Sequence, residues 1–159
     1  MIFITLGSQK FQFNRLLIEV DRLVVSGKIE EEVFAQIGYS DYRPQNYDFK
    51  EFLNRDEFLD MMNKCDKVIT HGGTGAIVGA VKQQKKVIAV PRLKKFKEHV
   101  DDHQLQIITE FVNMNFIKSV KDIKDLENVI LDIEFLSLKH YDSNTNVILN
   151  SIEEFINRG

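Results

Sequence analysis

A glycine-rich segment, His71-Gly72-Gly73-Thr74-Gly75, lies between a short apolar run at residues 66–70 and a helical pattern that starts at Gly75. Small residues at a junction between a strand and a helix leave the first N–H groups of the helix unpaired and direct the positive end of its dipole towards the turn. An anionic group such as a nucleotide diphosphate suits that position. The segment therefore predicts a phosphate site.

Two further polar segments follow apolar runs in the same way. Gly7-Ser8-Gln9 follows the run at residues 2–6, and a long segment from Pro91 to Gln104 follows the run at residues 86–90. The side chains of the long segment that could meet a ligand are Arg92, Glu98, Asp102, His103 and Gln104. Carboxylate, imidazole and amide groups together offer donors and acceptors for the hydroxyl groups of a polyol. These segments predict a site for a ligand that carries both phosphate and hydroxyl groups.

Simpler interpretations of the same residues stay open. His71 alone is most often a histidine at a strand end that hydrogen-bonds to the backbone, and glycines close many tight turns without binding anything. Asp101, Asp102 and Glu98 are also typical acids of a first helical turn. The basic residues around Lys94 to Lys97 most often form a solvated face, although they also suit an anionic lipid or a lipid-diphosphate acceptor.

Apolar periodicity predicts strands that alternate with helices along the chain. The expected strands are residues 2–6, 32–37, 47–52, 66–70, 86–90 and 116–120, and the expected helices are residues 13–25, 55–64, 75–83 and 100–114. The pattern is typical of a Rossmann-like α/β fold, in which a parallel sheet has helices on both faces and ligands bind beyond the carboxyl ends of the strands. The three polar segments should therefore converge on one crevice.

Details of three helices are also predicted. The helix at residues 55–64 should be capped by Asn54 or Asp56. A polar loop at residues 141–146 precedes an amphipathic stretch from about residue 147, which should dock on the domain or on a partner. The side chains expected to point inward are Phe58, Leu59 and Met62 from residues 55–64, and Leu105, Ile108 and Phe111 from residues 100–114.

Length and composition limit the function. At 159 residues, the chain is predicted to form a single domain over residues 1–159. A net charge of -3 without basic excess argues against general nucleic-acid binding. The single Cys65 fits a reducing compartment, and no segment has the length of a signal peptide core or a membrane span, so we expect a cytoplasmic protein with at most peripheral membrane contact.

The order of these motifs resembles the C-terminal, donor-binding half of family 28 GT-B glycosyltransferases. The features that carry the resemblance are the His71–Gly75 turn between strand and helix, the apolar strand that ends in Val90-Pro91, and Asp102-His103-Gln104 at the start of the next helix. The opening Thr5–Phe11 and Phe13–Leu16 further resemble stand-alone catalytic subunits of split enzymes. These are the PssE-like bacterial galactosyltransferase subunits of capsule and exopolysaccharide synthesis and, less closely, the eukaryotic subunit that transfers GlcNAc to a dolichol-linked acceptor. The similarity covers roughly residues 1–120.

The resemblance implies a UDP-sugar donor. The diphosphate would lie at Gly72–Gly75, the hexose hydroxyls at Asp102, His103 and Gln104, and the nucleotide beside Ser8 and Gln9. Relatives often carry a Glu on the helix after the glycine turn that pairs with the ribose, whereas this chain has Gly79 there, with Glu98 as a substitute candidate. The full set of expected donor-binding residues is Gly7, Ser8, Gln9, His71, Gly72, Gly73, Thr74, Gly75, Pro91, Arg92, Glu98, Asp102, His103 and Gln104.

The expected function is transfer of a hexose, galactose before GlcNAc, from a UDP-sugar to a lipid-diphosphate-linked saccharide. The resemblance implies that the acceptor site and the catalytic base belong to a membrane-anchored PssD-like partner, which would hold this subunit at the inner face of the membrane. A helix N-terminus can neutralise a diphosphate without metal, so no metal or cofactor is expected. The alternatives are a non-catalytic nucleotide-sugar-binding or regulatory module and, ranked lower because no GxGxxG pattern is present, an NAD-binding domain.

Overall fold

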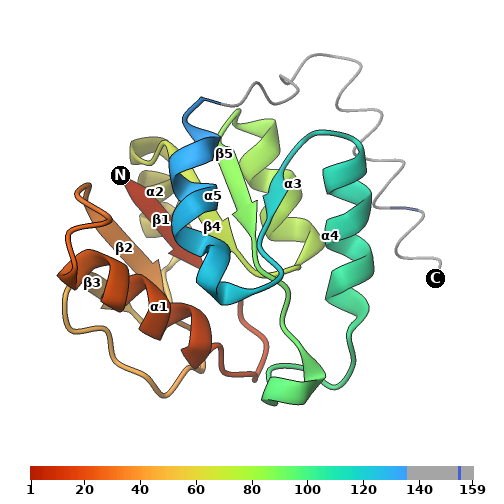
Figure 1. Cartoon of the computed structure of the whole chain (residues 1–159), viewed down its shortest axis with the longest axis horizontal. Helices are drawn as coiled ribbons and strands as arrows, with labels where there is room; N and C mark the ends of the chain where they lie inside the picture. Colours follow the sequence, from red (N-terminus) through yellow and green to blue (C-terminus); the bar gives the residue numbers. More distant parts are fainter. Residues whose placement is uncertain (136–153, 155–159) are drawn as a thin grey trace.

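The computed structural model describes residues 1–135 and residue 154, and a parallel sheet forms its centre (Figure 1). The strands are β1 (Ile2–Thr5), β2 (Val33–Gln36), β3 (Asp48–Lys50), β4 (Lys67–Thr70), β5 (Lys86–Ala89) and β6 (Lys118–Ser119). The helices are α1 (Asn14–Val25), α2 (Arg55–Lys64), α3 (Thr74–Lys82), α4 (His103–Asn113) and α5 (Leu126–Ile133), with 3-10 turns η1 (Lys94–Phe96) and η2 (Ile123–Asp125). All strand pairs in the sheet order β3-β2-β1-β4-β5-β6 are parallel, which confirms the predicted fold class.

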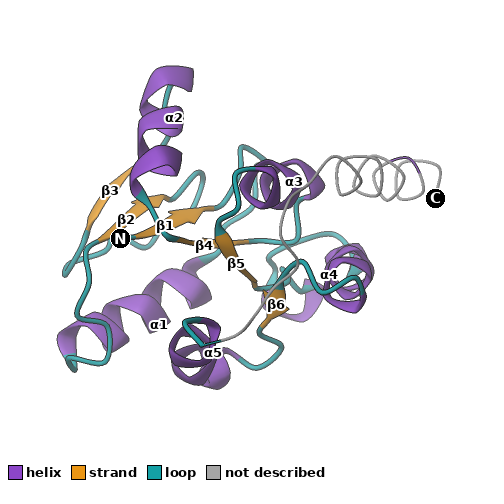
Figure 2. Cartoon of the chain, turned by 90° about the horizontal axis from the view of Figure 1, so that it is seen from above, coloured by secondary structure: helices purple, strands orange, loops and turns teal. Residues whose placement is uncertain are grey.

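Helices cover both faces of the sheet. Figure 2 shows α1 and α5 on one side, and α2 and α3 on the other. Side chains along β1 alternate between two apolar clusters, because successive residues of a strand point to opposite faces: Ile2 and Ile4 join α1 and α5, whereas Phe3 joins α2, α3 and α4. Strands that are buried on both faces carry apolar side chains on both faces, as the sequence pattern predicted.

The strand order places a topological switch point between β1 and β4. The chain builds β2 and β3 on one side of β1 and then returns to add β4, β5 and β6 on the other. Loops that leave the carboxyl ends of β1 and β4 therefore run in opposite directions and open a crevice between them, where ligands bind in sheets of this kind. The segments after β1 and β4 are Leu6–Phe13 and His71–Gly73.

Helix α2 confirms its predicted bounds and its predicted cap. The side chain of Asn54 accepts a hydrogen bond from the Glu57 N–H, and Glu57 accepts one in return from the Asn54 N–H, which completes a capping box. The prediction that Leu59 points inward is wrong, because α2 packs on the sheet through Phe58 and Met62 and leaves Leu59 40% exposed. The edge strand β3 is shorter than predicted.

Helix α4 begins later than predicted. Asp101 accepts a hydrogen bond from the His103 N–H, so the helix starts at His103 and Val100 lies in the preceding loop, 65% exposed. Ile108 and Phe111 are buried as predicted, together with Ile107, whereas Leu105 is half-buried. The predicted amphipathic stretch from about residue 147 lies outside the described residues, apart from the exposed helical residue Glu154.

Candidate functional site

The three predicted segments meet at the carboxyl ends of β1, β4 and β5. The Arg92 guanidinium donates to the Leu6 carbonyl at 2.7 Å, which joins the loop after β5 to the loop after β1. The backbone of Gly7 passes directly over the ring of His71, so that a Cβ at Gly7 would lie 2.8 Å from His71 Nε2. Gly7 has a φ of +71°, a conformation that glycine adopts without strain. The loops therefore meet at the switch point and border the crevice that the strand order predicts there.

The glycine turn presents an open helix N-terminus. Gly73 is the N-cap of α3, and no side chain caps the helix. A Cβ at Gly73 would lie 2.3 Å from His71 Cε1, and a Cβ at Gly72 would lie 2.5 Å from Gln104 Cβ, so both positions need glycine to pack against these side chains. Gly75 has nothing within 4 Å of an added Cβ. The turn thus offers backbone N–H groups of α3 to an anion without side-chain obstruction.

His71 forms the floor of the crevice between Gly7 and Gly73. The residue is 6% exposed, and its Nδ1 lies 3.3 Å from Gln104 Nε2. Desolvation by burial is the main cause that lowers the pKa of His71 to about 3, and the positive charges of Arg92 and His99 add to the effect. His71 is therefore uncharged at neutral pH.

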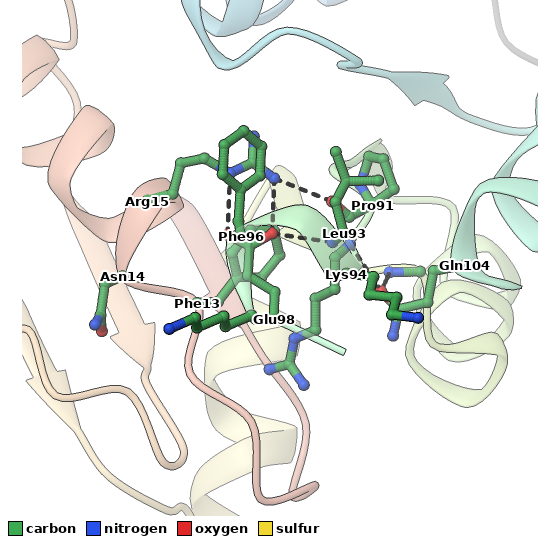
Figure 3. Close-up of polar contacts among 12 residues, drawn as sticks. Phe13, Asn14, Arg15, Pro91, Leu93, Lys94, Phe96, Glu98 and Gln104 are labelled. Carbon is green, nitrogen blue, oxygen red and sulfur yellow. Dashed lines mark hydrogen bonds and ion pairs between the residues drawn. The ribbon is translucent and has the colours of Figure 1, made fainter. Parts of the chain in front are cut away.

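Gln104 joins three elements through one side chain. Its Oε1 accepts hydrogen bonds from the Gly72 N–H and the Arg92 N–H, both at 3.0 Å, and the side chain is buried (Figure 3). Through its amide oxygen, Gln104 holds the glycine turn and the loop after β5 together. Contact between its NH2 group and a hexose hydroxyl stays a prediction.

Arg92 is an internal cation rather than an exposed ligand-binding group. It is 1% exposed, and its guanidinium carbon lies 5.5 Å from the centre of the Phe13 ring. Burial lowers the pKa of Arg92 to about 10, although the Glu98 carboxylate partly opposes the shift. Among the described residues, Nε and Nη1 of Arg92 have no hydrogen-bond partner. Arg92 therefore supports the first loop from beneath, through its bond to the Leu6 carbonyl, and its contact with a donor stays a prediction.

Glu98 is also directed inward. Arg15 donates to both carboxylate oxygens, Nε at 3.0 Å and Nη2 at 2.9 Å, and the Leu93 N–H donates a third bond at 3.0 Å (Figure 3). Glu98 is 1% exposed and its carboxylate is occupied by these three donors, so it is directed away from the surface; its role as a substitute for a ribose-binding Glu stays a prediction. Its role is to close the loop at residues 91–98 around the side chain of Arg15, which also donates to the Pro91 carbonyl.

Sequence reasoning missed Arg15 as a residue of the site. Its guanidinium lies 4.5 Å from the centre of the Phe96 ring, and it connects α1 to the loop after β5. Gln12 makes a similar connection by donating to the Phe96 and Lys97 carbonyls. No local pattern relates residues that are more than 75 positions apart, so only the shared sheet edge could have suggested these pairs.

The remaining predicted residues are accessible. Asp102 accepts a hydrogen bond from the Lys94 N–H through Oδ1 and is exposed, as is His103 at the start of α4. Ser8, Gln9 and Gly75 are exposed, and Gly7, Gly73 and Thr74 are half-buried. The predicted set thus separates into groups that are exposed or half-buried and groups that are buried, the latter being His71, Gly72, Pro91, Arg92, Glu98 and Gln104.

The described residues contain neither a cluster of metal ligands nor a membrane-spanning helix. Within residues 1–135 and 154, no three His, Cys, Asp or Glu side chains gather in a way that could hold a metal ion. In the same residues, none of the helices has the length and apolar character needed to cross a bilayer.

Comparison with known proteins gives the family. The model of the glycosyltransferase family 28 C-terminal domain matches residues 1–158. A search of curated proteins found no match. Two solved structures share the fold: the glycotransferase of kitacinnamycin, with a TM-score of 0.60 and 13% identity, and MurG of Acinetobacter baumannii, with a TM-score of 0.54 and 15% identity. The alignments cover 98% and 95% of this chain but 38% and 49% of those proteins, so the chain spans less than half of their length.

A matched pair of glycine substitutions tests the packing of the turn. We expect Gly73→Ala to lower the free energy of unfolding by about 1–3 kcal/mol, because its Cβ must displace the buried His71 ring. Gly75→Ala should leave it unchanged or raise it by at most about 1 kcal/mol, because the position is open and alanine favours a helix. Urea denaturation followed by circular dichroism measures both. Equal effects would contradict the close approach of Gly73 to His71.

The low pKa of His71 predicts a dependence of stability on pH. The unfolded chain takes up this proton below the ordinary pKa of 6.5, whereas the folded chain does so only near 3, so stability falls as the pH falls between these values. The slope attributable to one such group approaches about 1.4 kcal/mol per pH unit. We expect His71→Asn to remove this slope between pH 6 and pH 4, as measured by denaturant titration at each pH. The control His103→Asn, at an exposed histidine, should retain it.

Proposed function

Because the chain belongs to the family of glycosyltransferase family 28 C-terminal domains, we propose that it binds the sugar donor in a two-component glycosyltransferase. The donor is a UDP-hexose, with galactose favoured over GlcNAc, and the acceptor is a lipid-diphosphate-linked saccharide of bacterial capsule or exopolysaccharide synthesis. The observation that carries the proposal is the uncapped, glycine-lined N-terminus of α3 at the switch point between β1 and β4.

The crevice is suited to hold the leaving group. When the bond between the sugar and UDP breaks, negative charge develops on the diphosphate, and fixed N–H groups at a helix N-terminus stabilise that charge without reorganisation. Ser8 and Gln9 are exposed on the first loop, where they would contact the nucleotide, and Asp102 and His103 are exposed at the start of α4, where they would contact the hexose. Binding of this kind requires no metal.

The histidine in the floor of the crevice is not suited to act as the base for the acceptor hydroxyl. His71 is the histidine in its floor, and with a pKa of about 3 it is too weak a base to take a proton at neutral pH. We therefore place the base and the acceptor site on a membrane-anchored PssD-like partner.

The partner would bring the crevice to the cytoplasmic face of the membrane. Lys94, Lys95 and Lys97 are exposed beside Phe96 on the loop after β5, at the same sheet edge as the crevice. A basic loop at that place suits attraction to a lipid-diphosphate acceptor or to anionic lipid.

The second candidate function is a non-catalytic nucleotide-sugar-binding module. The observation that favours it is Gly79, which is exposed on α3 with nothing within 4 Å of an added Cβ, where relatives often carry a ribose-binding Glu. A module of this kind would bind the donor but transfer nothing, even with a partner.

Calorimetric titration tests donor binding. We expect the purified chain to bind UDP, UDP-galactose and UDP-GlcNAc but not NAD. Gly75→Asp should weaken uridine-nucleotide binding at least about tenfold, or about 1.4 kcal/mol, because the new carboxylate repels a diphosphate at the start of α3. Gly75 is the better position for this charge because a side chain at Gly73 would meet His71. The control Gln83→Asp places the same charge at the other end of α3, and equal weakening by both variants would count against the site.

Reconstitution tests the two-component arrangement. We expect little or no transfer of radiolabelled galactose from UDP-galactose to a lipid fraction by the chain alone, and transfer by the complex with its membrane-anchored partner. Robust transfer by the isolated chain would overturn the arrangement. Donor binding without transfer by the complex would instead support the non-catalytic module.

A further inference from the structure

The amide of Gln104 has a fixed orientation. Its Oε1 lies 3.0 Å from two backbone nitrogens, those of Gly72 and Arg92, and a backbone N–H can only donate. The atom that faces them must therefore be the oxygen, and the amide cannot be flipped. It follows that the group facing His71 Nδ1 at 3.3 Å is the NH2 group of the amide, which can only donate.

This arrangement determines where His71 carries its proton. Because Nδ1 faces a donor, it must supply its lone pair, and the proton of the neutral ring is then on Nε2. We infer that Gln104 is a positioning residue that fixes His71 as the Nε2–H tautomer and thereby presents an uncharged hydrogen-bond donor in the floor of the crevice. We assign the acceptor of this hydrogen bond as a diphosphate oxygen of the UDP-sugar, and this assignment rests on the proposed function.

The surroundings of Nε2 fit this role. Nε2 lies between the backbones of Gly7 and Gly73. A Cβ would lie 2.8 Å from it at Gly7 and 2.7 Å from it at Gly73, so glycine at both positions keeps side chains away from this atom. Among the described residues, Nε2 of His71 has no hydrogen-bond partner. In the same residues, the side-chain atoms that are both fully buried and without a partner are Nε and Nη1 of Arg92, so Nε2 is not one of the fully buried atoms. A ligand oxygen is thus the partner that the site lacks.

The charged groups nearby keep the ring neutral. Arg92 and His99 both disfavour a positive charge on His71. The Glu98 carboxylate, which would favour one, accepts its hydrogen bonds from Arg15 and Leu93 instead. His71 therefore supplies a directional N–H that does not change with pH across the physiological range.

Gln104→Glu separates positioning from packing. The carboxylate has nearly the same shape and still accepts from the Gly72 and Arg92 N–H groups, but its second oxygen offers His71 an acceptor where the wild type offers a donor. We expect the His71 proton to move to Nδ1, or the ring to become charged, with a raised pKa in either case. Gln106→Glu is the control, because it makes the same change at an exposed position of α4.

Nitrogen NMR of the full chain with labelled histidine measures the tautomer directly, with His71 assigned by comparison with His71→Asn. The wild type should show the Nε2–H form from pH 8 down to about pH 5, as should Gln106→Glu. The Nδ1–H form in the wild type, or an unchanged tautomer in a folded Gln104→Glu, would overturn the inference. The wild-type spectrum decides the matter even if Gln104→Glu does not fold.

Titration with UDP adds the functional readout. Wild-type affinity should show no inflection attributable to His71 between pH 5.5 and pH 8. Gln104→Glu should bind UDP about tenfold more weakly at pH 8, and its affinity should recover as the pH falls and Nε2 of His71 regains a proton. A loss of UDP affinity that is the same at every pH would indicate a packing effect alone and would overturn the role of His71 in binding. If the wild type shows the Nε2–H tautomer but binds no uridine nucleotide, the positioning by Gln104 stands and the proposed function fails.

Discussion

The architecture of the crevice depends on one side chain, the amide of Gln104. Its oxygen satisfies two backbone N–H groups, one from the glycine turn after β4 and one from the loop after β5, while its nitrogen faces the ring of His71. Buried backbone N–H groups without partners are costly, so the two loops keep this relative position only while the amide lies between them. Because Gln104 belongs to the first turn of α4, it also sets how that helix approaches the sheet.

Polar groups beneath the crevice are organised so that few of them reach the ligand. Glu98 is neutralised by Arg15, Arg92 is held by the Leu6 carbonyl, and His71 is uncharged. Buried charges of this kind are costly unless paired, and their pairing here fixes the paths of the three loops. A ligand then meets mainly backbone N–H groups and a few exposed side chains. Such a surface compensates a diphosphate through fixed dipoles rather than through mobile cations.

The sequence was sufficient for the fold and for the convergence of the three polar segments at one edge of the sheet, because apolar periodicity and glycine placement act over a few residues. It was insufficient for side-chain direction in the loop at residues 91–102, since that depends on partners from other elements. Glu98 looked like an accessible carboxylate, but Arg15 on α1 draws it inward. Gln104 looked like a sugar-binding group because Asp102-His103-Gln104 is polar throughout, yet helical geometry turns Gln104 towards the glycine turn and leaves its two neighbours exposed.

The buried environment that suits one part of a transfer reaction, stabilisation of the leaving group, does not suit the other part, removal of a proton from the acceptor. A site that stabilises a departing diphosphate benefits from N–H donors and from the absence of nearby negative charge, and those conditions also lower the basicity of His71. Proton acceptance from an acceptor hydroxyl needs the opposite environment, in which a carboxylate or imidazole retains a pKa near neutrality. One small crevice cannot easily meet both requirements. This physical conflict is the reason for our proposal that a second surface, which closes over the crevice, carries the base.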